Sequence, residues 1–152
     1  MLFRSELLEI AKKYDISPSL LNLEITESAY VEDPDVLMDV LKRLRDAGFH
    51  IHMDDFGSGY SSLNTLKDMP INTLKADTCF LAALGDGPKA ANILTSVVQM
   101  AKCLDLPVIA EGVETESQLQ FLKSIGCNEA QGYFFARPLP ASEFELLCAT
   151  YH

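Results

Sequence analysis

Five short apolar segments, separated by segments with helical spacing, constrain the fold of this chain more than any other feature. The apolar segments cover residues 20–24, 49–54, 71–77, 107–111 and 129–134. Polar residues stand at or near the ends of the first four and within the fifth: Glu24, Asp54 with Asp55, Lys75 with Asp77, Glu111 and Gln131. Short strands that alternate with helices predict a parallel sheet with right-handed crossovers. Polar residues gathered at the carboxyl ends of such strands are typical of a (β/α) barrel, whose active site lies at that face.

The intervening segments predict helices at residues 2–14, 34–47, 88–104 and 115–125, a short helix ending at Asp68, and a closing helix from Ser142. No linker or low-complexity stretch interrupts the series, so residues 1–152 are expected to form one unit. Five strands are fewer than the eight of a complete barrel, which typically needs ~250 residues. We therefore expect an α/β fold of the TIM-like (β/α)8 type that is incomplete. About five C-terminal parallel strands with their helices would be present, and the N-terminal strands of the barrel would be missing.

The composition excludes several classes of protein. A content of 48% hydrophobic and 22% charged residues is that of a globular chain with a core. A net charge of −10 argues against DNA binding, although metal ions can still attract a small phosphorylated ligand. No apolar stretch has the length of a membrane span and no signal peptide is recognisable, which favours a cytoplasmic location. The four cysteines are widely spaced, and we expect reduced, mostly buried thiols.

Asp54 and Asp55 form the sharpest local motif. Adjacent strand residues point to opposite faces, but the chain bends at the end of the strand, so both carboxylates can reach one site. The alternative is a turn in which they cap the following backbone. Glu24, at an equivalent strand end, favours a hard divalent cation, because such ions need several oxygen ligands. Converging carboxylates of this kind suggest metal-assisted hydrolysis of a phosphate ester. Glu27 either braces a neighbouring loop or is a solvated carboxylate.

Lys75 is unusual because a lysine inside an apolar strand is costly unless it is paired. It can pair with Asp55, Asp77 or Glu111 at the strand ends, or extend to solvent from the strand tip. Glu111 is a candidate metal ligand or general base, and Gln131 is either a substrate contact or a structural amide. His50 and His52 share a strand face with Asp54, but their position deeper in the strand favours buried core residues over metal ligands.

Five motifs in this order closely resemble the EAL domain family. They are Leu23-Glu24-Ile25-Thr26-Glu27-Ser28, Asp54-Asp55-Phe56-Gly57-Ser58-Gly59-Tyr60-Ser61-Ser62-Leu63, Lys75-Ala76-Asp77, Ala110-Glu111-Gly112-Val113-Glu114-Thr115 and Gln131-Gly132-Tyr133-Phe134. Proteins of that family are cyclic di-GMP phosphodiesterases with a TIM-like barrel, and they act in signal transduction by this bacterial second messenger. The resemblance covers essentially the whole chain and implies hydrolysis of cyclic di-GMP to linear pGpG with Mg²⁺ or Mn²⁺.

The resemblance also implies a role for each residue of the motifs. Glu24 and Asp54 would bind a first metal ion, with Asp54 bridging to a second ion that Asp55 helps to hold. Lys75 and Glu111 would orient and deprotonate the attacking water. Three further sets have supporting roles: Asp77 and Gln131 as site-organising or substrate-contacting groups, Phe56, Gly57, Ser58 and Gly59 in a loop that couples metal binding to dimerisation, and Glu27 as the glutamate that steadies this loop.

The chain departs from the family pattern in one respect. The Glu-Ala-Leu tripeptide that names the family, with its metal-binding glutamate, does not occur, nor does the asparagine ligand that normally follows it. Two functional classes therefore stay open. One is a partial phosphodiesterase domain whose hydrolysis is weak or undetectable, and the other is a non-catalytic module that binds cyclic di-GMP or a protein. A sensory or GGDEF domain upstream is a further partner that the resemblance implies.

The expected incomplete barrel has a consequence for association. Its open sheet would have two unpaired edges and would expose an apolar interior, because parallel strands are normally buried on both faces. We therefore expect a homodimer or a higher oligomer, in which a second copy covers the gap.

Overall fold

The computed structural model describes residues 2–26, 34–57, 63–127 and 129–150. The strands are β1 (Asn22–Thr26), β2 (His50–Phe56), β3 (Thr73–Ala76), β4 (Val108–Glu111) and β5 (Glu129–Gln131). The helices are α1 (Leu2–Lys13), α3 (Pro34–Asp46), α4 (Leu63–Asp68), α5 (Thr78–Ala82), α6 (Pro88–Cys103), α7 (Glu116–Ile125) and α8 (Ala141–Thr150), with short 3₁₀ turns η1 (Pro18–Leu20) and η2 (Ala83–Asp86). The predicted strands and helices are all present, whereas α5 and the 3₁₀ turns were not predicted.

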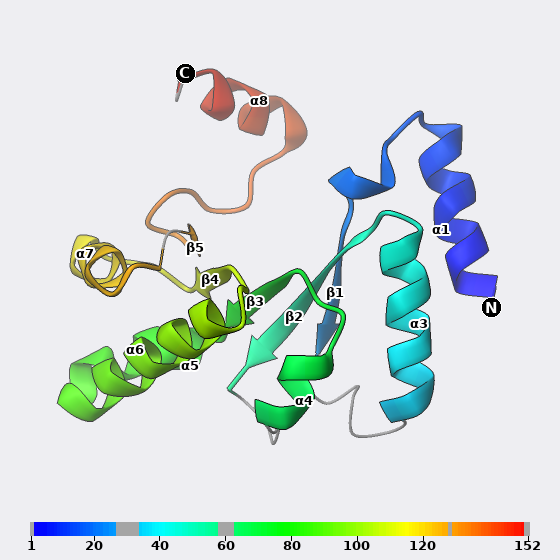
Figure 1. The fold of residues 1–152 in the computed structure, drawn as a ribbon. Helices are drawn as coiled ribbons and strands as arrows, with labels where there is room; N and C mark the ends of the chain where they lie inside the picture. The colour runs from blue at the N-terminus through cyan, green and yellow to red at the C-terminus, as the bar shows by residue number, and fades with distance from the viewer. Residues whose placement is uncertain (1, 27–33, 58–62, 128, 151–152) are drawn as a thin grey trace.

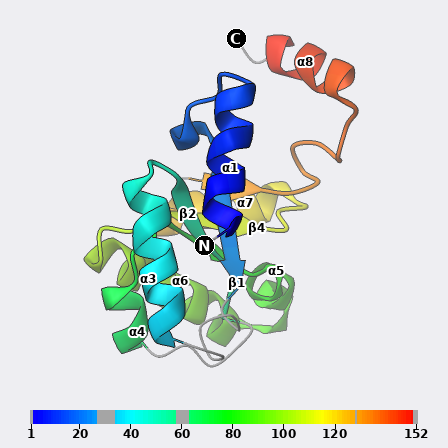
Figure 2. The ribbon, with the colours of Figure 1, turned by 90° about the vertical axis from the view of Figure 1, so that its right-hand side faces the viewer.

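The strands form one parallel sheet in the order β1-β2-β3-β4-β5, so every strand pairs with its neighbours along the chain (Figure 1). The prediction of a parallel α/β sheet is therefore confirmed. Within the described residues β1 and β5 are the two edges. Seen after a 90° turn, α1 lies in front of the sheet and α8 stands away from it at the end of an extended segment (Figure 2).

Local sequence signals explain where several helices begin and end. α3 begins at Pro34, and Gly48 follows the helix with a φ of 96°, a value that favours glycine. α7 begins with a capping box, in which the Thr115 hydroxyl accepts from the Gln118 amide and the Gln118 side chain accepts from the Thr115 amide. Gly126 ends this helix in the left-handed conformation.

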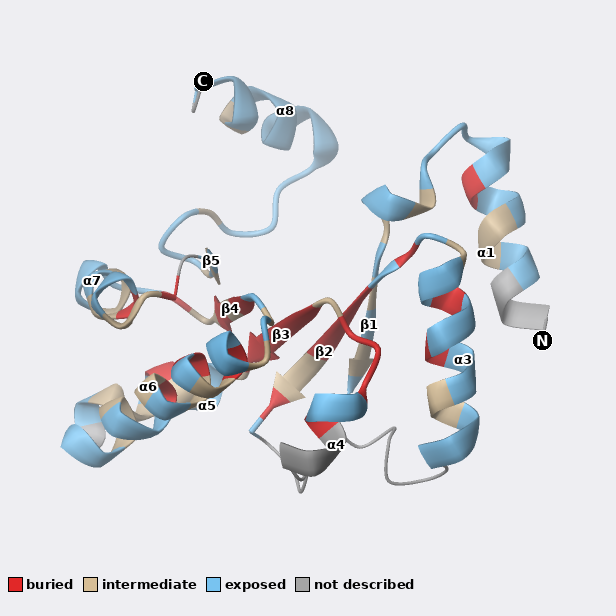
Figure 3. Cartoon of the chain, viewed as in Figure 1, coloured by how far each residue is buried: buried red, intermediate tan, exposed pale blue. Residues whose placement is uncertain are grey.

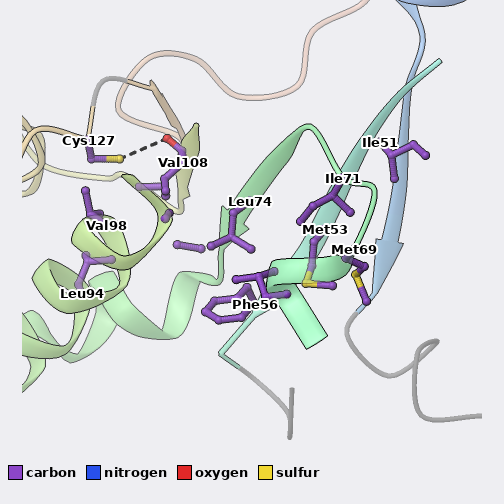
Figure 4. Close-up of a cluster of buried hydrophobic side chains, with 14 of the residues drawn as sticks. Ile51, Met53, Phe56, Met69, Ile71, Leu74, Leu94, Val98, Val108 and Cys127 are labelled. Carbon is purple, nitrogen blue, oxygen red and sulfur yellow. Dashed lines mark hydrogen bonds between the residues drawn. The ribbon is translucent and has the colours of Figure 1, made fainter. Parts of the chain in front are cut away.

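One face of the sheet carries the hydrophobic core. Alternate residues of the strands, such as Ile51, Met53 and Leu74, are fully buried there against helices that lie along this face (Figure 3). Leu94 and Val98 of α6 lie close to the side chains of β3 and β4 (Figure 4). Cys127 closes this end of the core and donates a hydrogen bond to the Val108 carbonyl.

The opposite face of the sheet is polar, which corrects the prediction that an apolar interior would be exposed. The residues that alternate with the core positions are Asn22, Glu24, Thr26, His50, His52, Asp54, Thr73, Lys75, Ile109, Glu111, Glu129 and Gln131. Only Ile109 among them is apolar. The prediction failed because it followed the general rule that parallel sheets are apolar on both faces, whereas the residues of this second face are mostly polar.

Two further expectations need correction. His52 is buried as predicted, but His50 is exposed, since it stands at the first position of β2. The cysteines are free as predicted, but Cys127 is the only buried one, and Cys79, Cys103 and Cys148 are exposed. Among the described residues, no helix combines the length and the apolar character that a membrane span requires.

Candidate active site

Lys75 lies at the centre of a cluster of charged side chains from four neighbouring strands. Its Nζ atom lies 2.7 Å from Glu24 Oε1 of β1, 2.8 Å from Asp54 Oδ1 of β2 and 3.0 Å from Glu111 Oε1 of β4. The side chain of Lys75 is only 7% exposed. Lys75 is paired, as expected, rather than extended to solvent. Glu111 was an expected partner, whereas the contacts with Glu24 and Asp54 were not predicted.

The carboxylates keep Lys75 charged. Burial by itself would lower the pKa of the Lys75 ammonium, but the nearby carboxylates of Asp54, Glu24 and Glu111 outweigh burial and raise the pKa above its ordinary value of 10.5. Lys75 is therefore a hydrogen-bond donor and a fixed positive charge near neutral pH. It does not act as a proton acceptor there.

Asp54 and Asp55 lie in an irregularity of β2. Met53 pairs with Leu74 and Phe56 pairs with Ala76, so β2 has one residue more than β3 over this stretch. Such an insertion is a β-bulge, which re-aims the side chains of the bulged strand. Asp55 has a φ of 54°, the left-handed conformation that most residues avoid. The bulge explains how two consecutive residues of a strand present their carboxylates to one site.

Asp54, Asp55 and Glu111 each offer a carboxylate oxygen, and these three oxygens lie within 4.8 Å of one another. Asp54 Oδ1 is buried and faces the Lys75 ammonium at 2.8 Å. Three hard oxygen donors at this spacing fit a divalent cation such as Mg²⁺ or Mn²⁺. The structure places Glu24 against Lys75 and outside this group of three.

Asp77 connects the bulge to the next helix. Its carboxylate accepts a hydrogen bond from the Cys79 amide at 2.7 Å and so caps α5. The Cys79 thiol and, to a smaller extent, the Cys79 amide lower the pKa of Asp77. The pKa of Asp55 is raised, first by burial and then by the negative charges of Asp54 and Asp77. A raised pKa means that Asp55 binds a cation more weakly at low pH, where a proton competes with the ion.

Gln131 pairs with Glu111 at the ends of β5 and β4. The next residue, Gly132, is required by packing, because a Cβ atom there would overlap the backbone of Val113. The Val113 amide donates to the Gln131 carbonyl at 3.0 Å, so this close approach fixes Gln131 beside Glu111. A hollow of about 310 Å³ opens at this point, lined by Thr78, Glu111, Gly112, Glu114, Gln131, Gly132 and Tyr133. A ligand that reaches Glu111 would also meet Gln131.

The structure thus brings together the residues that the motifs singled out at the strand ends. Sequence reasoning missed the bulge and the capping role of Asp77, although the position of Asp77 directly before an apolar segment was a signal for a helix start. Glu27, Ser58 and Gly59 lie outside the described residues.

The family model of the EAL domain matches residues 2–138, which include all of these positions. The chain belongs to the EAL domain family. The cyclic di-GMP phosphodiesterase PA2567 of Pseudomonas aeruginosa is 41% identical over 143 residues, which cover 94% of this chain and 24% of that protein. This chain therefore spans about a quarter of that relative's length.

Solved structures of EAL proteins share the fold. The PaMucR phosphodiesterase in complex with c-di-GMP has a TM-score of 0.88 and 39% sequence identity over 92% of this chain and 57% of that chain. The manganese and cy-diGMP complex of Klebsiella pneumoniae BlrP1 has a TM-score of 0.82 and 33% identity over 88% of this chain and 34% of that chain. The predicted relation to EAL barrels is thereby confirmed.

Proposed function

We propose that this chain is the part of an EAL phosphodiesterase domain that carries most of its catalytic residues, and that the domain hydrolyses cyclic di-GMP to linear pGpG with Mg²⁺ or Mn²⁺. The observation that supports this most strongly is the convergence of Glu24, Asp54 and Glu111 on Lys75, beside the oxygen group of Asp54, Asp55 and Glu111. The EAL relatives named phosphodiesterases, and the manganese and cy-diGMP complex, agree with this assignment.

The charge of the site supports a requirement for metal ions. Glu24, Asp54, Asp55, Asp77 and Glu111 are five carboxylates against the single ammonium of Lys75 in this cluster. Such a field repels the two phosphates of a cyclic dinucleotide. Bound divalent ions would reverse the local charge, attract a phosphodiester and make the attacking water more acidic.

The proposed roles of the chain's own residues follow from their positions. Asp54 and Asp55 hold divalent ions, with Glu24 completing the set from β1. Glu111 accepts the proton of the water that attacks phosphorus, and Lys75, which remains charged, orients that water and the Glu111 carboxylate. Gln131 contacts the substrate in the hollow beside Glu111.

A second function is favoured by one sequence observation. The Glu-Ala-Leu tripeptide does not occur in this chain. We infer from this that the chain alone binds cyclic di-GMP or a protein partner with little or no hydrolysis. An assay of pGpG formation with Mn²⁺, beside a binding measurement with cyclic di-GMP, separates the two functions. Binding without product supports the module, and turnover supports the enzyme.

Calorimetric titration with Mn²⁺ should show weak binding that Asp54→Asn abolishes. The substitution removes the carboxylate of Asp54 from the group of Asp54, Asp55 and Glu111 but keeps the shape of the side chain. Binding should also strengthen as the pH rises through the raised pKa of Asp55, since deprotonation frees a ligand. Asp46→Asn, which alters an exposed carboxylate at the end of α3, is the matched control. Unchanged Mn²⁺ affinity of Asp54→Asn would contradict the proposed site.

A chain of this size is also expected to self-associate. Its accessible surface is 9879 Å², whereas a monomeric protein of this mass exposes about 7,600 Å². The difference exceeds the area of about 800 Å² that each partner buries in a standard interface. Exposed apolar side chains near α8, such as Tyr133, Phe144 and Leu146, contribute to this excess of accessible surface. We propose a homodimer or a higher oligomer.

Light scattering at micromolar concentration should give a mass above that of a monomer, and Leu146→Lys should lower this mass, because it places a charge in the exposed apolar surface. Glu145→Lys, on the same helix, makes a larger change in charge without removing an apolar group and should leave the mass unchanged. A monomeric wild-type chain would contradict the proposal.

A further inference from the structure

The backbone of the bulge is fixed at two points by the segment that follows β3. The carbonyl of Phe56 accepts a hydrogen bond from the Asp77 amide at 3.3 Å. One residue further on, Gly57 has a φ of 102°, and a Cβ atom added to it would overlap the ring of Phe80. The ring of Phe80 therefore lies directly against the Cα atom of Gly57.

These two contacts come from one structural unit. Asp77 caps α5, and the Phe80 amide donates to the Asp77 carbonyl at 3.1 Å, so both residues belong to the first turn of that helix. Phe80 is partly buried and packs against the edge of the hydrophobic core, whereas its neighbour Leu81 lies within the core. The tip of the Phe80 ring makes a second contact, with Gly57, which a smaller side chain at position 80 would lose.

The bulge needs such support because its conformation is unfavourable in isolation. Asp55 has a positive φ within a strand, a conformation that costs free energy for a residue with a Cβ atom, although aspartate tolerates it better than most. Without the ring, Gly57 could adopt a wider range of conformations, since it has no side chain. The bulge could then relax to a regular strand, which would turn the Asp55 carboxylate to the face opposite Asp54.

We propose that Phe80 is a positioning residue, whose ring holds Gly57 and the bulge so that the Asp55 carboxylate stays beside Asp54 and Glu111. This inference rests on the proposed function, in which Asp55 holds a divalent ion. Phe80 itself touches no ion and no substrate. Its effect reaches the site through the backbone of residues 55–57. In other proteins, too, groups that do not touch the metal ion orient its ligands.

The test is a Mg²⁺ titration of the full chain followed by the amide signals of Asp54, Asp55 and Gly57 in NMR spectra. Phe80→Ala should weaken Mg²⁺ affinity by about 10- to 100-fold, the usual effect of removing a group that orients a metal ligand. Phe80→Leu, which refills most of the volume over Gly57, should restore most of the affinity. Phe121→Ala removes a partly buried ring from α7 and is the control for general destabilisation. It should retain wild-type affinity.

Spectra of the metal-free protein make the outcome independent of the proposed function. Phe80→Ala and Phe80→Leu both lose the ring current of Phe80, so the comparison between them reports the backbone: the Asp55 and Gly57 signals should move further in Phe80→Ala, and Phe121→Ala should leave them in place. If wild-type protein binds no Mg²⁺, the proposed metal chemistry fails, but signals displaced further in Phe80→Ala than in Phe80→Leu still support the positioning role. Equal signals in the two Phe80 variants, or a loss of affinity in Phe80→Ala no greater than in Phe121→Ala, would overturn it.

Discussion

Glu111→Gln should lower the turnover of cyclic di-GMP by about 10²- to 10⁴-fold, which corresponds to a barrier increase of about 3–5 kcal/mol. The substitution keeps the shape of the side chain but removes the basic oxygen that we propose accepts the proton of water. The contact with the Lys75 ammonium also loses its negative partner. The measurement is the rate of pGpG formation with Mn²⁺, in this chain and in a fusion that places the N-terminal part of the PaMucR phosphodiesterase domain before residue 1.

Glu143→Gln, which changes an exposed carboxylate on α8, is the control and should retain the rate of the parent protein. A Mn²⁺ titration of Glu111→Gln assigns its role further, because a pure proton acceptor leaves affinity unchanged whereas a ligand does not. Turnover within a factor of about two of the parent, well below the usual contribution of a general base, would show that Glu111 has no catalytic role.

Lys75→Met should destabilise the metal-free chain by about 3 kcal/mol, because removal of one partner from a buried ion pair leaves the other charges uncompensated. Methionine retains much of the volume of the buried lysine, so the lost interaction is mainly the charge shared with Glu24, Asp54 and Glu111. Urea unfolding at neutral pH with a chelator measures the difference. Addition of Mn²⁺ should recover part of the lost stability, since a cation that binds only the folded state stabilises it.

The pH dependence of this effect has a defined direction. The folded-state pKa of Lys75 lies above its ordinary value of 10.5, so the stabilisation is complete below that value and is lost as the pH rises through the folded-state pKa. The difference between wild type and Lys75→Met should therefore persist through neutral and mildly alkaline pH and shrink only in strong alkali. Lys42→Met, which removes an exposed lysine of α3, should cost little at any pH. Equal stability of the Lys75 and Lys42 variants would rule out the ion cluster as a stabilising element.

The fold was largely predictable because its signals are local. Each strand is a short apolar segment, and each boundary has a proline, a glycine or a capping residue, as in the capping box of Thr115 and Gln118. The candidate site was predictable for a related reason. Parallel strands place their carboxyl ends at one edge, so Glu24, Lys75 and Glu111 had to converge once the strand order was right.

Features that depend on contacts between distant segments could not be predicted. The bulge at Asp54 and Asp55 appears only when β2 is laid against β3, because it is a difference in register between two strands. The helix α5 has five residues, too few for a periodic pattern, and its role becomes visible only through the contact of Phe80 with Gly57. The polar second face of the sheet was missed because the rule for average parallel sheets, which are apolar on both faces, does not hold for strands that carry the charged residues of the candidate site.

The sequential order of the strands has a consequence for the way this protein acquires function as it folds. Each strand pairs only with the units directly before and after it, so the sheet can grow by local steps that close short stretches of chain. The cluster of charged side chains around Lys75 does not form by such local steps. Its members come from β1, β2, β3 and β4 and meet only when all four strands are in register. A partly formed sheet that lacks one of these strands would have no complete cluster of charged side chains around Lys75. Divalent ions should therefore bind only after the last of these strands has docked, and they should slow unfolding while leaving the early steps of folding unchanged.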